Sequence, residues 1–254
     1  SVMGAFTYEN YKYTNLGASG SGFFNDIVET YAIGTASTVN VPSSGYSDYT
    51  LLSYLGRINY TYRDKYFITA NFRADGSSRY SEGDKWAYFP SAALAWRLSN
   101  EKFFKENIIC NDLKLRIGYG SSGSTAIGAY QTLVMLSPGK VYLGDLLTHY
   151  APSARYPGKL KWETTDQTNF GIDAGFLDNK MRLTIDYYIK STRNLLNNVT
   201  MPASTGYTYT VQNVGEIQNK GIEFLIDANI YNREKFRWNT SFNFSLNRNK
   251  VIKL

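Results

Sequence analysis

Two segments joined by a turn decide the fold: Tyr54-Leu-Gly-Arg-Ile-Asn-Tyr-Thr-Tyr62 and Tyr66-Phe-Ile-Thr-Ala-Asn-Phe-Arg-Ala74, with Arg63-Asp-Lys65 between them. In both segments the residues at every second position are mostly apolar or aromatic, and the positions between them include Arg, Asn and Thr. Successive side chains of a strand point to opposite faces, so a period of two indicates strands. The stretch therefore predicts a β-hairpin with one apolar and one polar face.

The same alternation continues outward from this hairpin. It recurs at residues 88–98, 113–119, 168–176, 181–189, 222–230 and 236–246, with a ninth, poorer instance within 2–13. The apolar frame of the eight clear segments contains no charged residue. The opposite frame contains twelve: Arg57, Arg73, Asp75, Arg97, Lys114, Arg116, Asp173, Arg182, Asp186, Glu223, Asp227 and Arg237. One sheet face therefore suits hydrocarbon and the other suits water.

The connections between these segments alternate in length. Residues 63–65, 177–180 and 231–235 form short connections, and 99–112 forms a short one that looks helical. The intervening connections are long at 14–53, 120–167 and 190–221 and of medium length at 75–87. In an antiparallel meander every other connection lies at the same end, so all tight turns share one side. Membrane β-barrels have this asymmetry, with short periplasmic turns and long extracellular loops.

Aromatic residues mark the tight-turn end of the apolar face. An aromatic girdle is expected at a membrane interface, and the candidates are Tyr60, Tyr62, Tyr66, Trp96, Phe176, Phe236 and Trp238. Across the chain 22 Tyr, 14 Phe and 4 Trp occur in 254 residues. The rings of Tyr and Trp carry both apolar and polar atoms, so this number of them suits surfaces that are partly in contact with water.

Composition excludes several classes of protein. The chain is 43% hydrophobic, so it should fold, but it has no apolar run long enough for a transmembrane helix. Cys110 and His149 are the only residues of their types, which excludes an intramolecular disulfide and a Cys/His zinc set. The net charge of +6 is spread along the chain without basic runs, so no nucleic-acid partner is expected. We expect no cofactor and no metal.

A soluble β-sandwich is the alternative that the patterning leaves open, because the apolar face could be its core. Sandwich strands usually have five or six residues, whereas these segments run to nine to eleven. That length is what a tilted strand needs to cross hydrocarbon, so the pattern favours the membrane barrel.

Five blocks in order carry a resemblance to a known family. They are Arg73-Ala-Asp-Gly-Ser-Ser-Arg-Tyr80 with Trp86-Ala-Tyr-Phe-Pro-Ser-Ala-Ala-Leu-Ala-Trp-Arg-Leu98, Leu113-Lys-Leu-Arg-Ile-Gly-Tyr119, Trp162-Glu-Thr-Thr-Asp-Gln-Thr-Asn-Phe-Gly-Ile-Asp173 with Gly175-Phe-Leu-Asp-Asn179, Asp186-Tyr-Tyr-Ile-Lys-Ser-Thr192, and Asn213-Val-Gly-Glu-Ile-Gln-Asn-Lys-Gly-Ile-Glu223. In this series the sequence resembles the SusC/RagA-type TonB-dependent outer-membrane proteins of Bacteroidetes.

The resemblance implies an all-β fold, an antiparallel meander that is part of a 22-stranded transmembrane β-barrel with an N-terminal plug inside it. It also implies import of oligosaccharides or peptides through the outer membrane of a Gram-negative bacterium. The partners would be a SusD-like surface lipoprotein, TonB acting on the plug, and outer-membrane lipid.

Eight or nine strands cannot close a barrel of that size, and an open sheet edge is not tolerated in lipid. We therefore expect residues 1–254 to be an interior fragment of the barrel, without the plug and the closing strands; the first residue is Ser, not Met. A non-transporting outer-membrane adhesin and a soluble carbohydrate-binding β-protein are the alternatives.

Catalysis is not expected. Asp173 with Asp186, and Glu223 with Asp227, could be interpreted as the paired carboxylates of a glycosidase. Inward-facing carboxylates can instead pair across strands with arginines, and the candidates are Arg57, Arg116, Arg182 and Arg237. His149 lies in a long connection away from any nucleophile motif.

Seven tyrosines in the long connections are the candidate substrate-binding residues: Tyr46, Tyr49, Tyr142, Tyr150, Tyr156, Tyr207 and Tyr209. Flat rings can stack on sugar faces or pack against peptide side chains, since aromatics carry much of the contact energy at interfaces. Alternatively, the rings pack loop against loop or against the lipoprotein. The sequence leaves both interpretations open.

Overall fold

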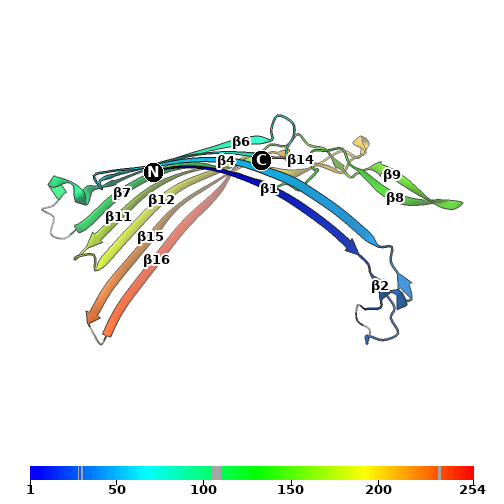
Figure 1. Ribbon diagram of the computed structural model, residues 1–254, viewed down its shortest axis with the longest axis horizontal. Helices are drawn as coiled ribbons and strands as arrows, with labels where there is room; N and C mark the ends of the chain where they lie inside the picture. Colours follow the sequence, from blue (N-terminus) through cyan, green and yellow to red (C-terminus); the bar gives the residue numbers. More distant parts are fainter. Residues whose placement is uncertain (28, 30, 105–109, 234–235) are drawn as a thin grey trace.

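A single nine-stranded antiparallel sheet makes up the body of the molecule in a computed structural model that describes residues 1–27, 29, 31–104, 110–233 and 236–254 (Figure 1). The strands lie in the order β1 (Val2–Gly17), β4 (Ser43–Tyr62), β5 (Tyr66–Ser77), β6 (Trp86–Arg97), β7 (Cys110–Ser124), β11 (Glu163–Phe176), β12 (Met181–Arg193), β15 (Glu216–Arg233) and β16 (Phe236–Lys253). Each strand pairs with its neighbours along the meander, which confirms the predicted fold class.

All eight predicted strands are present, and the poorer ninth is β1. Their predicted length is wrong, however, because the nine strands have between 12 and 20 residues. The alternating pattern marks only the part of each strand whose outer face is apolar. Beyond it the ladder continues between mostly polar residues, for example from Thr50 to Ser43 opposite β1. The sheet therefore extends past its apolar band.

The tight turns lie at one end of the sheet. In the β4–β5 turn Arg63 and Asp64 have positive φ, and the Lys65 N–H donates to the Tyr62 carbonyl at 3.0 Å. The β11–β12 turn uses three positive-φ residues from Leu177 to Asn179. The helical-looking connection contains two short turns, η2 (Leu98–Asn100) and η3 (Lys102–Phe104). Residues 110–112 of that predicted connection belong to β7 instead, whereas its residues 105–109 and residues 234–235 of the last connection lie outside the described residues.

The long connections at the opposite end contain structure of their own. They hold the hairpin β8 (Leu136–Leu143) with β9 (Asp145–Pro152), the small sheet of β10 (Arg155–Tyr156), β14 (Tyr209–Asn213) and β13 (Leu196–Thr200), and the pair β2 (Gly20–Ser21) with β3 (Thr38–Val39). Two further short turns are η1 (Ile33–Thr35) and η4 (Ala203–Thr205). Figure 1 shows the β8–β9 hairpin projecting away from the sheet.

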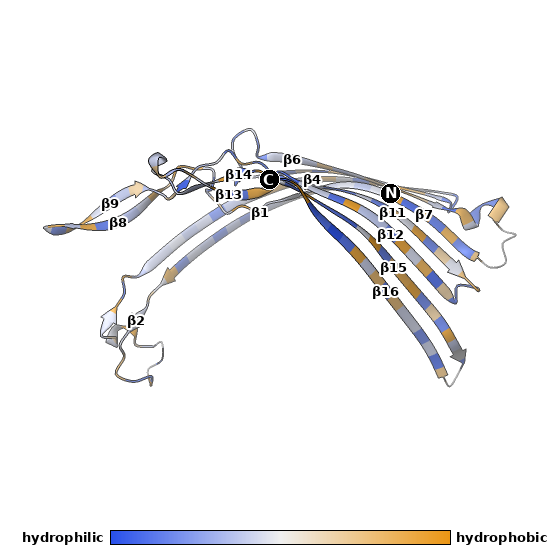
Figure 2. Ribbon diagram, turned by 180° about the vertical axis from the view of Figure 1, so that it is seen from behind, coloured by the Kyte–Doolittle hydropathy of each residue, from blue (hydrophilic) through white to orange (hydrophobic). Residues whose placement is uncertain are grey.

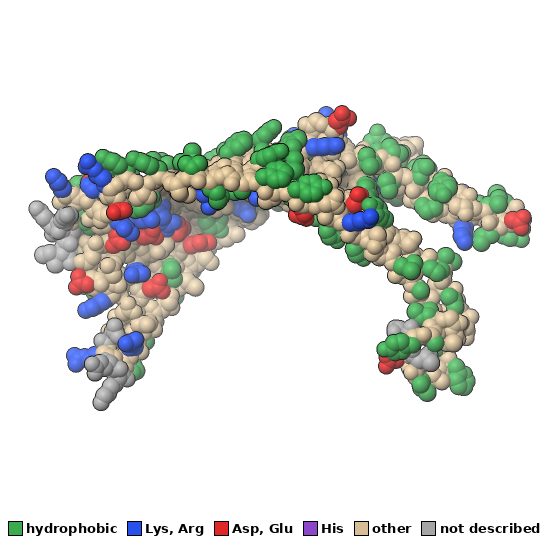
Figure 3. All heavy atoms as spheres, viewed as in Figure 1, with side chains coloured by type: hydrophobic (Ala, Val, Ile, Leu, Met, Phe, Trp, Pro, Cys, Tyr) green, Lys and Arg blue, Asp and Glu red, His purple; other side chains and the backbone are tan. Residues whose placement is uncertain are grey.

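The two faces of the sheet differ as the sequence predicts. The outer face stays exposed, with 52% of Phe72, 51% of Leu94 and 60% of Phe242 accessible. Figure 2 shows apolar and polar residues alternating along the strands, and Figure 3 shows hydrophobic side chains on one surface and charged ones beneath it. Among the described residues no second sheet covers the apolar face, so the structure does not support the β-sandwich alternative. None of the helical turns in the described chain is long and apolar enough to cross a membrane.

Candidate functional site

The inner face of the sheet carries an ion-pair network centred on Arg116 of β7. Its guanidinium donates to both carboxylate oxygens of Asp173 on β11, at 2.8 and 2.9 Å, and to Asp186 on β12 at 3.0 and 3.1 Å. This confirms the predicted pairing of inward carboxylates with an arginine. Because the aspartates are engaged with a cation, they are not arranged as a free acid and base for glycoside hydrolysis.

A glycine lets this network lie flat against the wall. Gly171 stands opposite both Arg116 and Asp186 in the ladder. A Cβ atom at Gly171 would lie 2.6 Å from the guanidinium carbon and 2.5 Å from an Asp186 carboxylate oxygen. Real Cβ atoms do not approach so closely, so any other residue would push the arginine away from the sheet. The wall thus keeps its charges close to the backbone.

Polar contacts continue across the neighbouring strands of the inner face. Arg57 donates to the Asn71 side chain at 2.6 Å, and Asn71 donates to Ser91 at 2.9 Å. Arg73 forms an ion pair with Asp75 at 2.7 Å. Of the four candidate arginines, only Arg116 therefore pairs with carboxylates as predicted. Arg57 has a neutral amide as its partner, and within the described chain Arg182 and Arg237 form no ion pair. The inner face is a wettable wall of fixed charges and amides.

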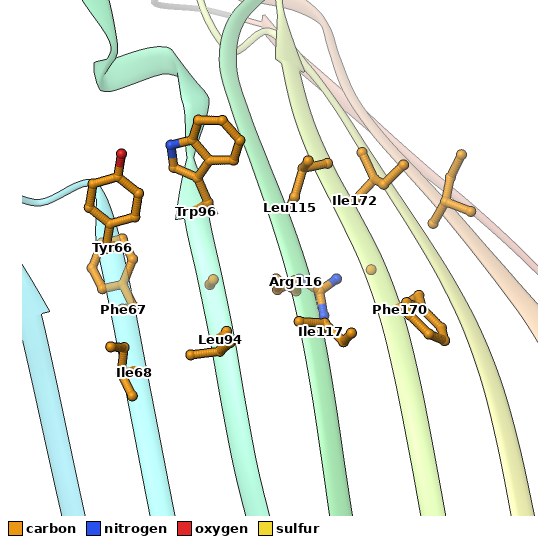
Figure 4. A pocket seen from close by; sticks show the side chains of 13 residues that line it. Tyr66, Phe67, Ile68, Leu94, Trp96, Leu115, Arg116, Ile117, Phe170 and Ile172 are labelled. Atoms are coloured by element: carbon orange, nitrogen blue, oxygen red, sulfur yellow. The ribbon is translucent and has the colours of Figure 1, made fainter.

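The outer face presents rows of apolar side chains with an open hollow of about 720 Å³ between them. Figure 4 shows the two rows, which are Tyr66, Trp96, Leu115 and Ile172, and Ile68, Leu94, Ile117 and Phe170. These outward side chains come from four adjacent strands. A surface of this kind is stable in contact with hydrocarbon.

A hydrogen-bonded cluster ends this apolar band near the tight turns. The Glu101 carboxylate accepts from Lys65 Nζ at 2.7 Å, from the Tyr66 hydroxyl at 3.0 Å and from the Trp96 indole N–H at 3.3 Å. The hydrogen bonds from Lys65 and Tyr66 hold the pKa of Glu101 below its ordinary value. Tyr66 and Trp96 thus have apolar ring faces and a polar edge, as the predicted aromatic girdle requires.

At the loop end, a small buried core joins connections that are far apart in sequence. We call it the mouth cluster, and it consists of Tyr80, Phe89, Ile127, Leu160, Trp162 and Val211. The rings of Tyr80 and Trp162 stack with centroids 4.8 Å apart. Trp162 Nε1 donates to the Lys85 carbonyl at 3.1 Å. Burial raises the pKa of Tyr80, whose hydroxyl donates to the Ser124 carbonyl at 2.8 Å.

Arg79 secures one of these connections to the sheet. Its Nη1 donates to the carbonyls of Thr125 and Ile127, both at 3.0 Å, and its guanidinium lies 3.4 Å from the centre of the Tyr49 ring. Sequence reasoning missed Arg79 and the mouth cluster. The available signal was the family blocks, because Arg79, Tyr80, Phe89 and Trp162 all lie within them.

The structure does not bring the seven candidate tyrosines together in one site. Six of them lie in strands, although the sequence predicts them in loops: Tyr46 and Tyr49 in β4, Tyr142 in β8, Tyr150 in β9, Tyr156 in β10 and Tyr209 in β14. Tyr207 lies between η4 and β14. The reason is that paired strands continue into the long connections.

Two of these tyrosines are held by packing. Tyr49 stacks on Tyr11 with centroids 4.9 Å apart, and its hydroxyl donates to Glu9 at 3.2 Å. Tyr209 packs against the mouth cluster. These contacts favour the loop-packing interpretation for both residues.

The other tyrosines present accessible rings. Tyr142 and Tyr150 are 74% and 68% exposed and share one face of the β8–β9 hairpin, and Tyr46 is 53% exposed. Tyr156 and Tyr207 form an edge-to-face pair with centroids 5.1 Å apart. Their role in substrate binding stays a prediction.

His149 is the remaining titratable residue that the sequence singled out. It lies in β9 opposite Gly139 of β8, on the projecting hairpin. Within the described ranges, no three His, Cys, Asp or Glu side chains gather where they could hold a metal ion.

The chain matches, over residues 2–252, the family described as TonB dependent receptor-like, beta-barrel. It belongs to the TonB-dependent receptor β-barrel family. The resemblance seen in the sequence blocks is thereby confirmed. Barrels of this family are receptors and transporters, not enzymes, and lie in the outer membrane of Gram-negative bacteria.

Individual relatives agree with this TonB-dependent receptor assignment. The chain is 35% identical over 260 residues to TonB-dependent receptor P3 of Formosa agariphila, matching 100% of this chain and 26% of the relative. It is 39% identical over 213 residues to TonB-dependent receptor SusC of Bacteroides thetaiotaomicron, matching 81% of this chain and 21% of SusC. The chain thus spans about a quarter of the length of these relatives.

The RagAB peptide transporter is a similar solved structure. The sequence identity is 27% and the TM-score is 0.86, and the match covers 100% of this chain and 28% of that chain. The curved sheet therefore has the shape of one part of a larger receptor barrel.

Proposed function

We propose that residues 1–254 are an interior segment of a TonB-dependent importer of bulky nutrients, oligosaccharides or peptides. The observation that carries the proposal is the contrast between the two faces of the sheet. The outer face is apolar and exposed, and the inner face is lined by Arg116, its two aspartates and the amides around Arg57. Lipid outside and a wet passage inside satisfy both faces at once.

The relatives support the nature of the cargo and the partners. SusC is named a TonB-dependent receptor, and RagAB is described as a peptide transporter. By analogy, this receptor works with a SusD-like surface lipoprotein, and TonB supplies energy through a plug that lies outside this segment. No bond is made or broken; the passage is opened by a change in conformation.

The tyrosines with accessible rings at the loop end are the proposed substrate contacts. Tyr156 and Tyr207 already form a ring pair, and such a pair can extend to a sugar face or to a peptide side chain. Tyr142 and Tyr150 present a second surface on the projecting hairpin (Figure 1).

Uptake by cells that carry the full-length receptor tests the proposal. Labelled oligosaccharide and peptide pools are offered to wild-type cells, to cells without the receptor and to cells without TonB. We expect at least one pool to accumulate only when both proteins are present. Accumulation that is equal in all three strains would refute import as the function.

A paired substitution tests the tyrosines separately. Tyr156→Ala with Tyr207→Ala should weaken binding of the accepted pool by about tenfold, because two aromatic contacts are removed. Tyr60→Ala is the matched control, since Tyr60 is a 54% exposed ring on the lipid-facing side. Unchanged affinity in the double variant would assign these rings to loop packing.

A further inference from the structure

Three basic side chains gather on the outer face of the sheet near its loop end. Lys220 of β15 lies directly opposite Arg248 of β16, and Lys250 follows two residues after Arg248, opposite Gln218. All three side chains are exposed. We call Lys220, Arg248 and Lys250 the basic patch.

The basic patch faces the same side as the apolar band. The β15–β16 register is unbroken between Ile222 opposite Leu246 and Gln218 opposite Lys250, so residues at even spacing share a face. Arg248 and Lys250 therefore continue the outward row that Phe244 and Leu246 begin. Figure 2 shows a hydrophilic stretch of β16 near the C-terminus, beyond the alternating part of the strand.

The basic patch brings like charges together. Directly opposed residues of an antiparallel pair have Cβ atoms about 5 Å apart, and like charges there are destabilising. Lys250 adds a third cation about 7 Å further along the strand. The strands' own carboxylates do not compensate, because Glu223 and Asp227 point to the inner face and Glu216 lies at the strand end opposite Lys253.

A neighbouring cation shows the contrast. Arg193 of β12, near the same end of the sheet, forms an ion pair with Asp166 of β11. Among the described residues no carboxylate forms an ion pair with Lys220, Arg248 or Lys250. The charge of the basic patch is therefore available to an anion from outside the described chain.

We propose that the basic patch binds the phosphate group of a phosphorylated lipid in the outer leaflet, whose acyl chains lie along the apolar row below it. A phosphate accepts charge-assisted hydrogen bonds from several cations at once. The apolar side chains of Leu246, Phe244 and Ile222 are 47%, 53% and 41% exposed and begin next to the patch. Phosphate above hydrocarbon is the arrangement of a lipid, whereas a free phosphate ion would use only the basic patch.

The inference rests on the proposed orientation, with the long loops outside the cell and the tight turns in the periplasm. Given that orientation, the loop end of the apolar band lies at the headgroups of the outer leaflet. The basic patch then lies at the depth where lipid phosphates are found.

Binding to purified lipid A, a phosphorylated and acylated disaccharide, tests the proposal. The full-length receptor is extracted from outer membranes in mild detergent and titrated with lipid A and with dephosphorylated lipid A. The variant combines Lys220→Gln, Arg248→Gln and Lys250→Gln. Lys190→Gln is the matched control, because Lys190 lies next to Ile189, which pairs with Lys220, but points to the inner face.

We expect the triple variant to bind lipid A about 100-fold more weakly, since each basic residue next to an anionic lipid contributes about a factor of five. Lys190→Gln should bind like the wild type, and dephosphorylated lipid A should bind both proteins equally weakly. Equal affinity of triple variant and wild type for lipid A would overturn the proposal. So would displacement of lipid A by inorganic phosphate, which would indicate a free-anion site.

Failure of the orientation is distinguishable from failure of the lipid site. The exposure of a cysteine label on the β8–β9 hairpin to an impermeant reagent on intact cells reports the orientation independently. Variants with reduced charge have folded if they reach the outer membrane at the wild-type level and keep the fast gel migration of a folded barrel. A loss of lipid binding in such a variant therefore reports the basic patch itself.

Discussion

The mouth cluster predicts a local, not a global, loss of stability when Trp162 is truncated to Ala. Trp162 is 5% exposed, stacks on Tyr80 at 4.8 Å, meets Phe89 edge-to-face at 5.7 Å and donates to the Lys85 carbonyl. Truncation of a buried Trp to Ala costs about 3–5 kcal/mol, and it also leaves that carbonyl without its donor.

This loss should appear in amide hydrogen exchange of the full-length receptor in detergent. A free-energy cost of about 3 kcal/mol corresponds to opening more than about 100-fold more frequent. We expect faster exchange in residues 78–85 and 153–162, which meet at the cluster, and unchanged exchange in the ladder between β5 and β6. The barrel strands keep their own hydrogen bonds, so the effect should not spread.

The matched control is Trp238→Ala. Trp238 has the same side chain but is 53% exposed on the outer face of β16. It should leave the loop exchange as in the wild type. The reasoning is refuted if Trp162→Ala leaves residues 153–162 as protected as before, or if it accelerates exchange throughout the sheet.

Two further predictions concern the wall and the tight-turn end. Arg116→Met leaves two half-buried aspartates without a cation, so it should lower the stability of the folded barrel by about 1–2 kcal/mol. The loss should appear as a lower temperature at which the barrel loses its fast gel migration. Arg57→Met should lower that temperature less, because the partner of Arg57 is a neutral amide, and equal losses would contradict the charge argument. The pKa of Glu101 is lowered in the folded protein, chiefly by the hydrogen bond from Lys65. The contribution of this carboxylate to stability is therefore present above the ordinary carboxyl pKa and is lost as the pH falls through the lowered value. After correction for intrinsic rates, hydrogen exchange of residues 98–104 should therefore accelerate in acid. Glu101→Gln should remove this dependence on pH. A pH response that persists in the variant would show that another group controls it.

The sheet could be predicted from the sequence because its environment repeats every two residues. Each outward position of β5 or β16 meets the same surroundings, so alternation alone identifies strand, face and order along the meander. The strand ends could not be predicted in this way. Ser43 to Thr50 of β4 pair with β1 through backbone groups, which any side chain supplies.

The loop end could not be derived from periodicity, since the mouth cluster has none. Ile127 and Leu160 come from opposite ends of the connection between β7 and β11, Val211 comes from the connection between β12 and β15, and only the folded chain makes them neighbours. The same holds for Tyr156 and Tyr207, whose rings meet across about fifty residues of sequence. Arg116 with Asp173 was predictable because both lie on inward positions of adjacent strands.

The mouth cluster also separates two parts of the molecule whose sequences can change at different rates. On one side are ladder-paired strands in which a single altered residue disturbs lipid contact or the inner wall. On the other are the tips of the long connections, such as the β8–β9 hairpin, which project beyond the buried core (Figure 1). A tip can be lengthened, shortened or exchanged between receptors without repacking the barrel, provided that Trp162 and its neighbours are retained. In an engineered receptor, a foreign hairpin should therefore be joined to the chain beyond the mouth cluster, where the tip of the connection begins.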